Sequence, residues 1–290
     1  MATLREIKRR IRSINNTAKV THAMELVAAT KIRKSQEKAL LARPYIDTLH
    51  QILRELSTKA GEKAHELLVK NNVKAQMAIL VSTDRGLVGG LNLNVFRETL
   101  KLEVENLKYV VVGKKGLSFA ARHAEVIASF HTEEQPFLDL ARTLTKLAIG
   151  AFRTGEVGAV YVISPKFIST IKQVPTITKI LPIELKVEQP TIPPSASLTD
   201  PLFKAELSLF EPASDLILER ILPHHILTLI YQILLEAKAS EHSARMVAMK
   251  NATDAASDLV DDLTLTYNQA RQEAVTSELL DIVTAQSAFE

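Results

Sequence analysis

The sequence MKNATDAASDLVDDLTLTYNQA, residues 249–270, decides the fold of this chain. Small and apolar residues recur in it at alternating spacings of three and four, the pattern of a narrow two-helix coiled-coil seam. The seam positions are Met249, Ala252, Ala256, Leu259, Leu263, Thr266 and Ala270. The wider stretch from Pro212 to Phe289 has no glycine and only one further proline, so it predicts a single helix about 110 Å long. A helix of that length must leave its domain or pair with another helix.

The N-terminal residues supply the partner helix. They carry the same spacing at Leu4, Ile7, Ile11, Ile14, Ala18, Thr21, Ala28 and Ile32. Residues 1–43 hold eleven Lys or Arg and three Glu, whereas residues 251–290 hold one Arg and eight acidic residues. We therefore expect the two helices to pair antiparallel, with opposite charges beside the seam. Pro44 predicts a kink or break in the N-terminal helix.

Composition limits the classes of function. The chain has 290 residues, which fits one or two domains, and only 5% aromatic residues, which suits a thin rod better than one large core. The absence of cysteine excludes disulfides, thiol nucleophiles and Cys-ligated metals. A net charge of +3 is too small to indicate nucleic-acid binding.

The sequence predicts neither a targeting segment nor a membrane span. The basic first twenty residues superficially resemble a transit peptide, but the apolar repeat runs on to Ile32, which favours a structural helix. The longest uncharged apolar run, residues 221–235, is shorter than the ~20 residues that a membrane span needs. Any membrane association is therefore expected to go through partners.

Between the two helices, strands alternate with helices, which is typical of a small, largely parallel α/β domain. Strands are predicted at 76–82, 109–113, 124–130 and 157–164, helices at 93–107, 115–122 and 138–152, a β-rich stretch with Pro175 and Pro182, a loop at 189–201 and a last strand at 205–210. The predicted organisation is an N-terminal helix (1–58), a connector (59–74), an α/β domain (75–190), a linker with the last strand (191–211) and a C-terminal helix (212–290).

The sequence predicts no active site. The turn STDRGLVGGLN, residues 82–92, leads from a strand into a helix, but its glycines do not form G-x-G-x-x-G, so a tight turn or subunit contact is favoured over nucleotide binding. The histidines form no metal-binding pair, since Val69 stands where H-E-x-x-H needs its second histidine. Asp261 and Asp262 are interpreted as a solvated helix face. We expect no catalytic residue, cofactor or metal.

Four stretches resemble the gamma subunit of F-type ATP synthases. They are residues 9–36 (RRIRSINNTAKVTHAMELVAATKIRKSQ), the turn at 82–92, residues 236–254 (EAKASEHSARMVAMKNATD) and residues 263–283 (LTLTYNQARQEAVTSELLDIV). Val88 replaces a cysteine often found in the family's turn, and Thr284-Ala285-Gln286 replaces its small, glycine-containing tail. No cysteine-bearing regulatory insertion is present, so thiol control is not expected.

The resemblance implies an antiparallel two-helix coiled coil formed by both termini, with an inserted Rossmann-like α/β domain. It implies a non-catalytic central rotor shaft that couples proton flow to ATP synthesis or hydrolysis. The implied partners are the alpha and beta subunits of the catalytic hexamer, the epsilon subunit and the c-subunit ring. The implied location is the cytoplasmic face of a bacterial plasma membrane, with the chain peripheral and present once per complex.

By matching positions, the resemblance assigns partner contacts to six residues: Met24, Arg85, Arg245, Gln272, Thr276 and Glu278. Met24 and Arg245 could equally pack inside the helix seam. Two alternative functions remain. A coiled-coil adaptor explains the rod but not the α/β domain, whereas a nucleotide-dependent enzyme explains that domain but lacks a phosphate loop.

Overall fold

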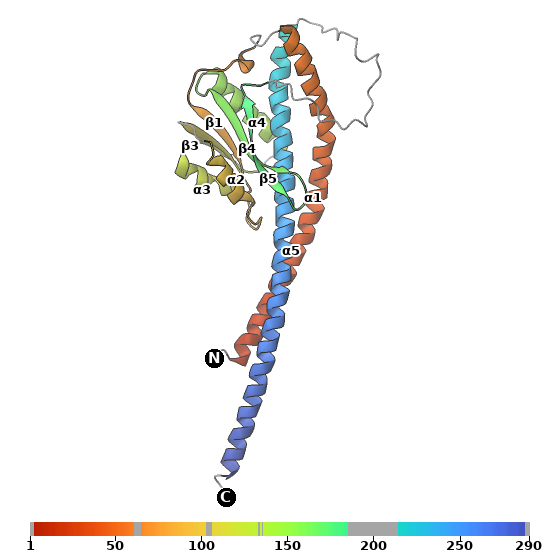
Figure 1. Cartoon of the computed structure of the whole chain (residues 1–290), viewed down its shortest axis with the longest axis vertical. Helices are drawn as coiled ribbons and strands as arrows, with labels where there is room; N and C mark the ends of the chain where they lie inside the picture. The colour runs from red at the N-terminus through yellow and green to blue at the C-terminus, as the bar shows by residue number, and fades with distance from the viewer. Residues whose placement is uncertain are drawn as a thin grey trace. The chain divides into compact units, whose positions relative to one another are not determined.

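The computed structural model describes residues 3–60, 65–102, 106–132, 134, 136–184 and 214–287. The chain divides into two compact units, and both long helices pass through both of them: α1 (Leu4–Ala60) and α5 (Ser214–Ser287) (Figure 1). One unit comprises residues 1–33, 87–89 and 242–290, and the other comprises residues 34–86 and 90–241. We call them the helix-pair unit and the sheet unit.

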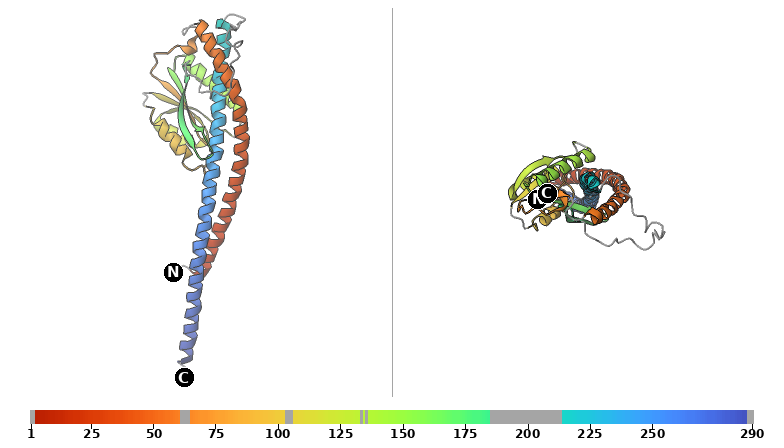
Figure 2. Two further views of the ribbon diagram at one scale, coloured as in Figure 1. Left: turned by 45° about the vertical axis from the view of Figure 1, so that its right-hand side comes forward. Right: turned by 90° about the horizontal axis from the view of Figure 1, so that it is seen from above.

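In the helix-pair unit, α1 and α5 run antiparallel and side by side (Figures 1 and 2). The seam that they bury is made of Ile7, Ala28, Ile32, Met249 and Ala256. Five of the predicted seam residues are thus buried, and small side chains such as Ala28 and Ala256 allow the two backbones to approach closely. The three-four spacing works because residues at these intervals lie on one face of a helix.

A contact between two threonines sets the register of the pair. The hydroxyl oxygens of Thr21 and Thr253 lie 2.7 Å apart and share a hydrogen bond. Counting equal numbers of residues away from this contact, in opposite directions, places Arg12 level with Asp262 and Leu4 level with Ala270. The C-terminal part of α5 beyond Ala270 therefore extends past the start of α1.

The opposite charges stay in solvent. Arg12, Lys19, Asp261 and Asp262 belong to the described residues, and all four side chains are exposed without an ion pair between them. Exposed pairs contribute at most about 1 kcal/mol each, so apolar burial in the seam, and not charge, supplies most of the pairing energy.

The sheet unit is built on five strands: β1 (Gln76–Val81), β2 (Leu107–Val112), β3 (Glu125–Phe130), β4 (Ala159–Phe167) and β5 (Gln173–Leu181). Their spatial order is β3-β2-β1-β4-β5, with β1 to β4 parallel and β5 antiparallel to β4. The connecting elements are η1 (Glu66–Leu68), α2 (Leu91–Thr99), α3 (Lys114–His123) and α4 (Phe137–Arg153). The largely parallel sheet predicted from the sequence is present.

Both faces of the sheet are covered, because successive side chains of a strand point to opposite sides. Met77, Ile79 and Val81 of β1 join the core that includes α4 and the sheet-unit lengths of α1 and α5. Ala78 and Leu80 join the second core, with side chains from α2 and α3. Burial on both faces explains why the central strand β1 is a continuous apolar run in the sequence.

Two local predictions need correction. Of the kink or break predicted at Pro44, the break is wrong, since α1 continues to Ala60. A proline inside a helix costs about 3 kcal/mol, and the buried side chains that follow it, Ile46, Leu49 and Leu53, offset that cost. The predicted helix 93–107 was also too long, since α2 ends at Thr99 and Leu107 already begins β2. The predicted loop 189–201 and last strand 205–210 lie outside the described residues.

Replacing Ala28 with leucine should weaken the helix pair. Ala28 is only 2% exposed, and overpacking a close helix contact costs about 1–3 kcal/mol. The matched control is Ala23→Leu on the exposed side of α1, which should change the free energy of unfolding by less than about 0.5 kcal/mol. Urea unfolding of both full-length variants measures the difference. Equal stability of the two variants would contradict the observed seam.

Candidate functional site

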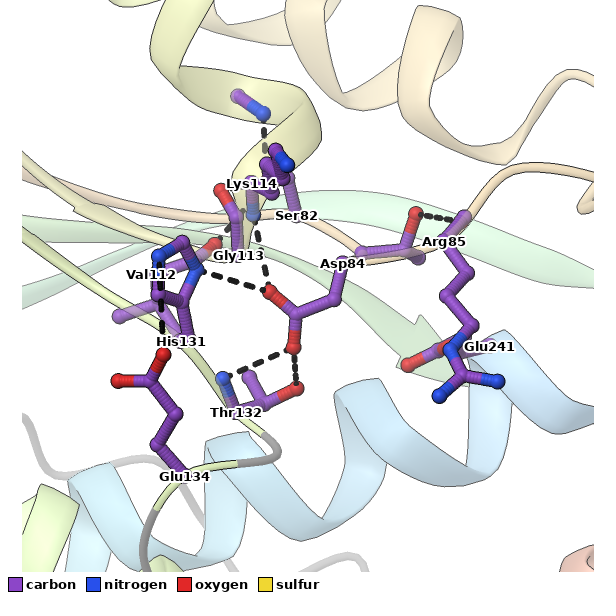
Figure 3. Close-up of polar contacts among 12 residues, drawn as sticks. Ser82, Asp84, Arg85, Val112, Gly113, Lys114, His131, Thr132, Glu134 and Glu241 are labelled. Atoms are coloured by element: carbon purple, nitrogen blue, oxygen red, sulfur yellow. Dashed lines mark hydrogen bonds and ion pairs between the residues drawn. The ribbon is translucent and has the colours of Figure 1, made fainter.

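The carboxyl ends of β1, β2 and β3 meet at one edge of the sheet, and the residues after β1 hold this edge together (Figure 3). Ser82, Thr83 and Asp84 satisfy the first three N–H groups of α3. Lys114 N–H donates to Asp84 Oδ1 at 3.0 Å, Lys115 N–H to the Thr83 carbonyl at 3.0 Å, and Gly116 N–H to Ser82 Oγ at 2.8 Å. A helix leaves these N–H groups without internal partners, so one segment of a neighbouring strand caps α3.

Asp84 also binds the turn after β3. Its Oδ2 accepts hydrogen bonds from the Thr132 N–H at 2.9 Å and from the Thr132 hydroxyl, and His131 Nδ1 lies 3.5 Å from Oδ1. The Asp84 side chain is 11% exposed. Burial alone would raise the pKa of Asp84, but the hydrogen bonds from Thr132, Lys114 and His131 outweigh it and lower that pKa. The carboxylate is therefore held in its charged form.

Two glycines make this close approach possible. A Cβ at Gly116 would lie 2.7 Å from Ser82 Oγ, and one at Gly113 would lie 2.2 Å from the Ser82 carbonyl oxygen. Gly113 also has a φ of 91°, which favours glycine. The turn Gly113-Lys114-Lys115-Gly116 is therefore shaped to receive Ser82.

A second set of hydrogen bonds closes the Arg85–Gly90 loop, which connects β1 to α2. Asn92 accepts from the Thr83 N–H at 3.2 Å and donates to the Thr83 hydroxyl at 2.8 Å. The Thr83 hydroxyl in turn donates to the Arg85 carbonyl at 2.7 Å. Thr83 and Asn92 thus hold the two ends of the loop together.

The cavity beside this edge is small. It has a volume of about 20 Å³ and is lined by polar groups of Ser82, Thr83, Asn92, Thr132, Lys238 and Glu241 together with apolar neighbours. That volume holds about one water molecule, whereas small-molecule pockets measure about 300–1,000 Å³. Within the described residues, no group of three or more His, Asp or Glu side chains is arranged to hold a metal ion. The edge is filled by the chain itself.

The six residues predicted to contact partners do not form one cluster. Met24, on α1, is 41% exposed, and Arg245 is half-buried. Gln272, Thr276 and Glu278 are exposed on the part of α5 that extends past the start of α1. At about 1.5 Å per residue, Gln272 lies about 40 Å from Arg245 along the helix. Arg85 is exposed in the Arg85–Gly90 loop of the sheet unit.

The sequence interpretation missed the polar network around Asp84. A signal was present, because Ser82, Thr83 and Asp84 are all residues that cap helices. They stand after a strand, however, and not before the helix that they cap, so local helix-start patterns could not identify α3 as their target.

Comparison with known proteins gives the family. A family model described as ATP synthase matches residues 3–289. An ATP synthase gamma chain from Opitutus terrae is 42% identical, with 99% of both chains covered. Another, from Methylacidiphilum infernorum, is 40% identical over the full length of both chains. The chain belongs to the ATP synthase gamma chain family.

Solved structures share the gamma-family fold of this chain. The rotor of the Euglena gracilis mitochondrial ATP synthase matches with a TM-score of 0.66 at 17% identity, covering 94% of this chain and 98% of that one. The central stalk and c-ring structure from Tetrahymena thermophila matches with a TM-score of 0.59 at 21% identity, covering 80% and 99%. The resemblance found in the sequence is confirmed, and gamma-family membership disfavours the adaptor hypothesis. Across the described part of the chain, the search for membrane spans found no helix with the length and apolarity to cross a bilayer.

Replacing Asp84 with asparagine tests the hydrogen-bonded carboxylate at this edge of the sheet, because the stability lost by the substitution should depend on pH. At neutral pH the wild-type chain should be more stable by about 1.5–3 kcal/mol, the contribution of hydrogen bonds to a charged group. Because folding lowers the pKa of Asp84 from its ordinary 3.8, this advantage is present above pH 3.8 and is lost as pH falls through the lower folded value.

Urea unfolding between about pH 7 and pH 3 measures that difference. Asp139→Asn is the matched control, since Asp139 is an exposed carboxylate in the first turn of α4. A wild-type advantage over Asp84→Asn that stayed constant down to pH 3 would contradict a charged, hydrogen-bonded Asp84.

Proposed function

We propose that this chain is the central rotor shaft of an ATP synthase and couples proton flow through the membrane sector to ATP synthesis or hydrolysis in the alpha–beta hexamer. The observation that carries the proposal is the 42% identity to an ATP synthase gamma chain over 99% of both chains. At that identity and coverage, both terminal helices and the sheet unit have counterparts in the relative.

The helix-pair unit has the features of a shaft. We interpret it as an antiparallel coiled coil, because its narrow seam of small and apolar residues follows the three-four spacing. Past the start of α1, the exposed end of α5 carries four large apolar side chains that are each at least half exposed: Val275, Leu279, Leu280 and Ile282. Exposed apolar groups of this kind favour a surrounding partner, and an apolar bearing formed by the alpha and beta subunits would cover them.

Coupling requires that the shaft contacts its three catalytic partners differently. A ligand or subunit shifts a conformational equilibrium only by its differential affinity for the states involved. We assign these contacts to Met24, Arg245, Gln272, Thr276 and Glu278 on the two helices and to Arg85 on the loop. The exposure of Met24 supports a partner contact for that residue over packing inside the seam.

The sheet unit would bind the remaining partners. We propose that its Rossmann-like α/β domain, expected from residues 75–190, contacts the epsilon subunit and the ring of c subunits. One copy per complex would then be held peripherally at the cytoplasmic face of a bacterial plasma membrane. The chain would be non-catalytic, in keeping with a sheet edge whose helix N-terminus is capped by Ser82, Thr83 and Asp84.

Reconstitution with alpha and beta subunits tests the rotor role. The full-length chain should raise their ATPase activity and should support ATP-driven proton pumping once the membrane sector is added. The chain alone should hydrolyse no ATP. Assembly of a complete complex without any stimulation of ATPase activity would contradict the proposal.

A chain truncated after Ala270 separates coupling from folding. The truncation removes the α5 end that extends past α1, and with it Gln272, Thr276 and Glu278. Because almost all the described side chains of this segment are exposed, the melting temperature of the isolated chain should change by less than about 2 °C. Protons pumped per ATP hydrolysed should nevertheless fall. Unchanged pumping efficiency in the truncated complex would remove this end of α5 from the coupling surface.

A further inference from the structure

We propose that Asp84 is a positioning residue. Its carboxylate occupies the place beyond the C-terminal ends of the strands where α/β proteins commonly bind an external anion, and it thereby fixes the Arg85–Gly90 loop. This role concerns the chain's own structure and does not depend on the rotor function. Asp84 differs in this from the six residues assigned to partner contacts, since it acts through the loop that follows it.

The position of Asp84 is one that an external anion occupies in many α/β proteins. In such sheets, anions bind beyond the carboxyl ends of the strands, at a helix N-terminus. Here Asp84 Oδ1 accepts a hydrogen bond from the Lys114 N–H at the start of α3, while Oδ2 accepts hydrogen bonds from the N–H and the hydroxyl of Thr132 (Figure 3). Two backbone N–H groups and one hydroxyl from two separate turns thus converge on one internal carboxylate.

The donors beside Asp84 are used as well. The next two N–H groups of α3, from Lys115 and Gly116, donate to the Thr83 carbonyl and to Ser82 Oγ. Asp84, Thr83 and Ser82 therefore accept hydrogen bonds from all of the first three N–H groups of α3. An external phosphate would have to displace Asp84 to reach these donors.

Anchoring at Asp84 has a consequence for the loop that begins at the next residue. Asp84 fixes the start of the loop to α3 and to the turn after β3, and the Thr83–Asn92 hydrogen bonds fix its two ends to each other. Within the loop, Leu87 and Gly89 have φ values of 62° and 57°, a conformation that costs a non-glycine residue energy and needs support from its surroundings.

The loop is also a covalent connection between the two units. Residues 87–89 group with the helix-pair unit, whereas the loop residues on either side of them group with the sheet unit. Besides α1 and α5, this loop is therefore a third place where the chain passes from one unit to the other. A change in how Asp84 anchors the loop will alter this connection while leaving the two long helices intact.

Chemical rescue of a full-length Asp84→Ala variant tests the proposal. The substitution removes the carboxylate, and formate can restore a carboxylate of matching size. Melting temperature should fall in the variant, and amide hydrogen exchange should accelerate in peptides covering residues 85–90. Sodium formate, compared with sodium chloride at equal ionic strength, should raise the variant's melting temperature by about 3 °C or more and restore protection of the loop.

Two controls separate rescue from a general salt effect. Wild-type chain and the Asp139→Ala variant, which loses an exposed carboxylate on α4, should show no difference between formate and chloride. The proposal is overturned if formate stabilises neither the loop nor the fold of Asp84→Ala. It is also overturned if, without formate, amides of residues 85–90 in that variant exchange at the wild-type rate.

Asp84→Asn keeps the test decisive if the alanine variant fails to fold. Asparagine preserves the shape of the side chain and one acceptor oxygen but loses the charge and the second acceptor. Exchange of residues 85–90 should then accelerate relative to the wild-type chain while protection of β1 and β4 in the centre of the sheet is retained. Loop exchange equal to that of the wild-type chain would overturn the proposal.

Discussion

The contact between the first and the last helix of the chain is the constraint on which the rest of the structure depends. The hydrogen bond between Thr21 and Thr253 joins residues that lie 232 positions apart, and small seam residues such as Ala28 and Ala256 bring the two backbones together around it. Because the chain leaves this pair along α1 and returns along α5, everything between them is an insertion held at both ends. The sheet unit therefore folds against lengths of the same two helices, with Leu53 of α1 and Leu222 of α5 in its core.

A sheet of this topology offers an anion position at its carboxyl edge, and here the chain occupies that position with its own side chains. Ser82 and Asp84 take the N–H donors that a phosphate would need, and Gly113 and Gly116 provide the space for them to do so. The α/β arrangement that binds nucleotides in other proteins thus anchors the Arg85–Gly90 loop here. This use of the fold fits the proposed role of the chain as a rotor shaft that transmits motion.

The sequence predicted the helix pair and the strands of the largely parallel sheet because both follow from local patterns of apolar residues. Burial on one helix face repeats every three or four residues, and a strand buried on both faces is a continuous apolar run, as at residues 76–81. The errors occurred where distant contacts outweigh local preference. Pro44 is tolerated because Ile46, Leu49 and Leu53 beyond it are buried, and Asp84 caps a helix that begins 30 residues later. The six partner contacts came from resemblance to a family, since an exposed residue such as Gln272 carries no local signal of what covers it.

A disulfide across the seam tests whether α1 and α5 turn together as one shaft. The chain has no cysteine, so Thr21→Cys with Thr253→Cys introduces the only pair able to oxidise, at positions whose hydroxyl oxygens lie 2.7 Å apart. The disulfide should form on mild oxidation, and the cross-linked complex should keep its ATP-driven proton pumping. Ala23→Cys with Thr253→Cys, which places one thiol on the exposed side of α1, should not cross-link. Failure of the seam pair to cross-link would contradict the contact between α1 and α5, and a loss of pumping on oxidation that a reductant reverses would contradict their rotation as one shaft.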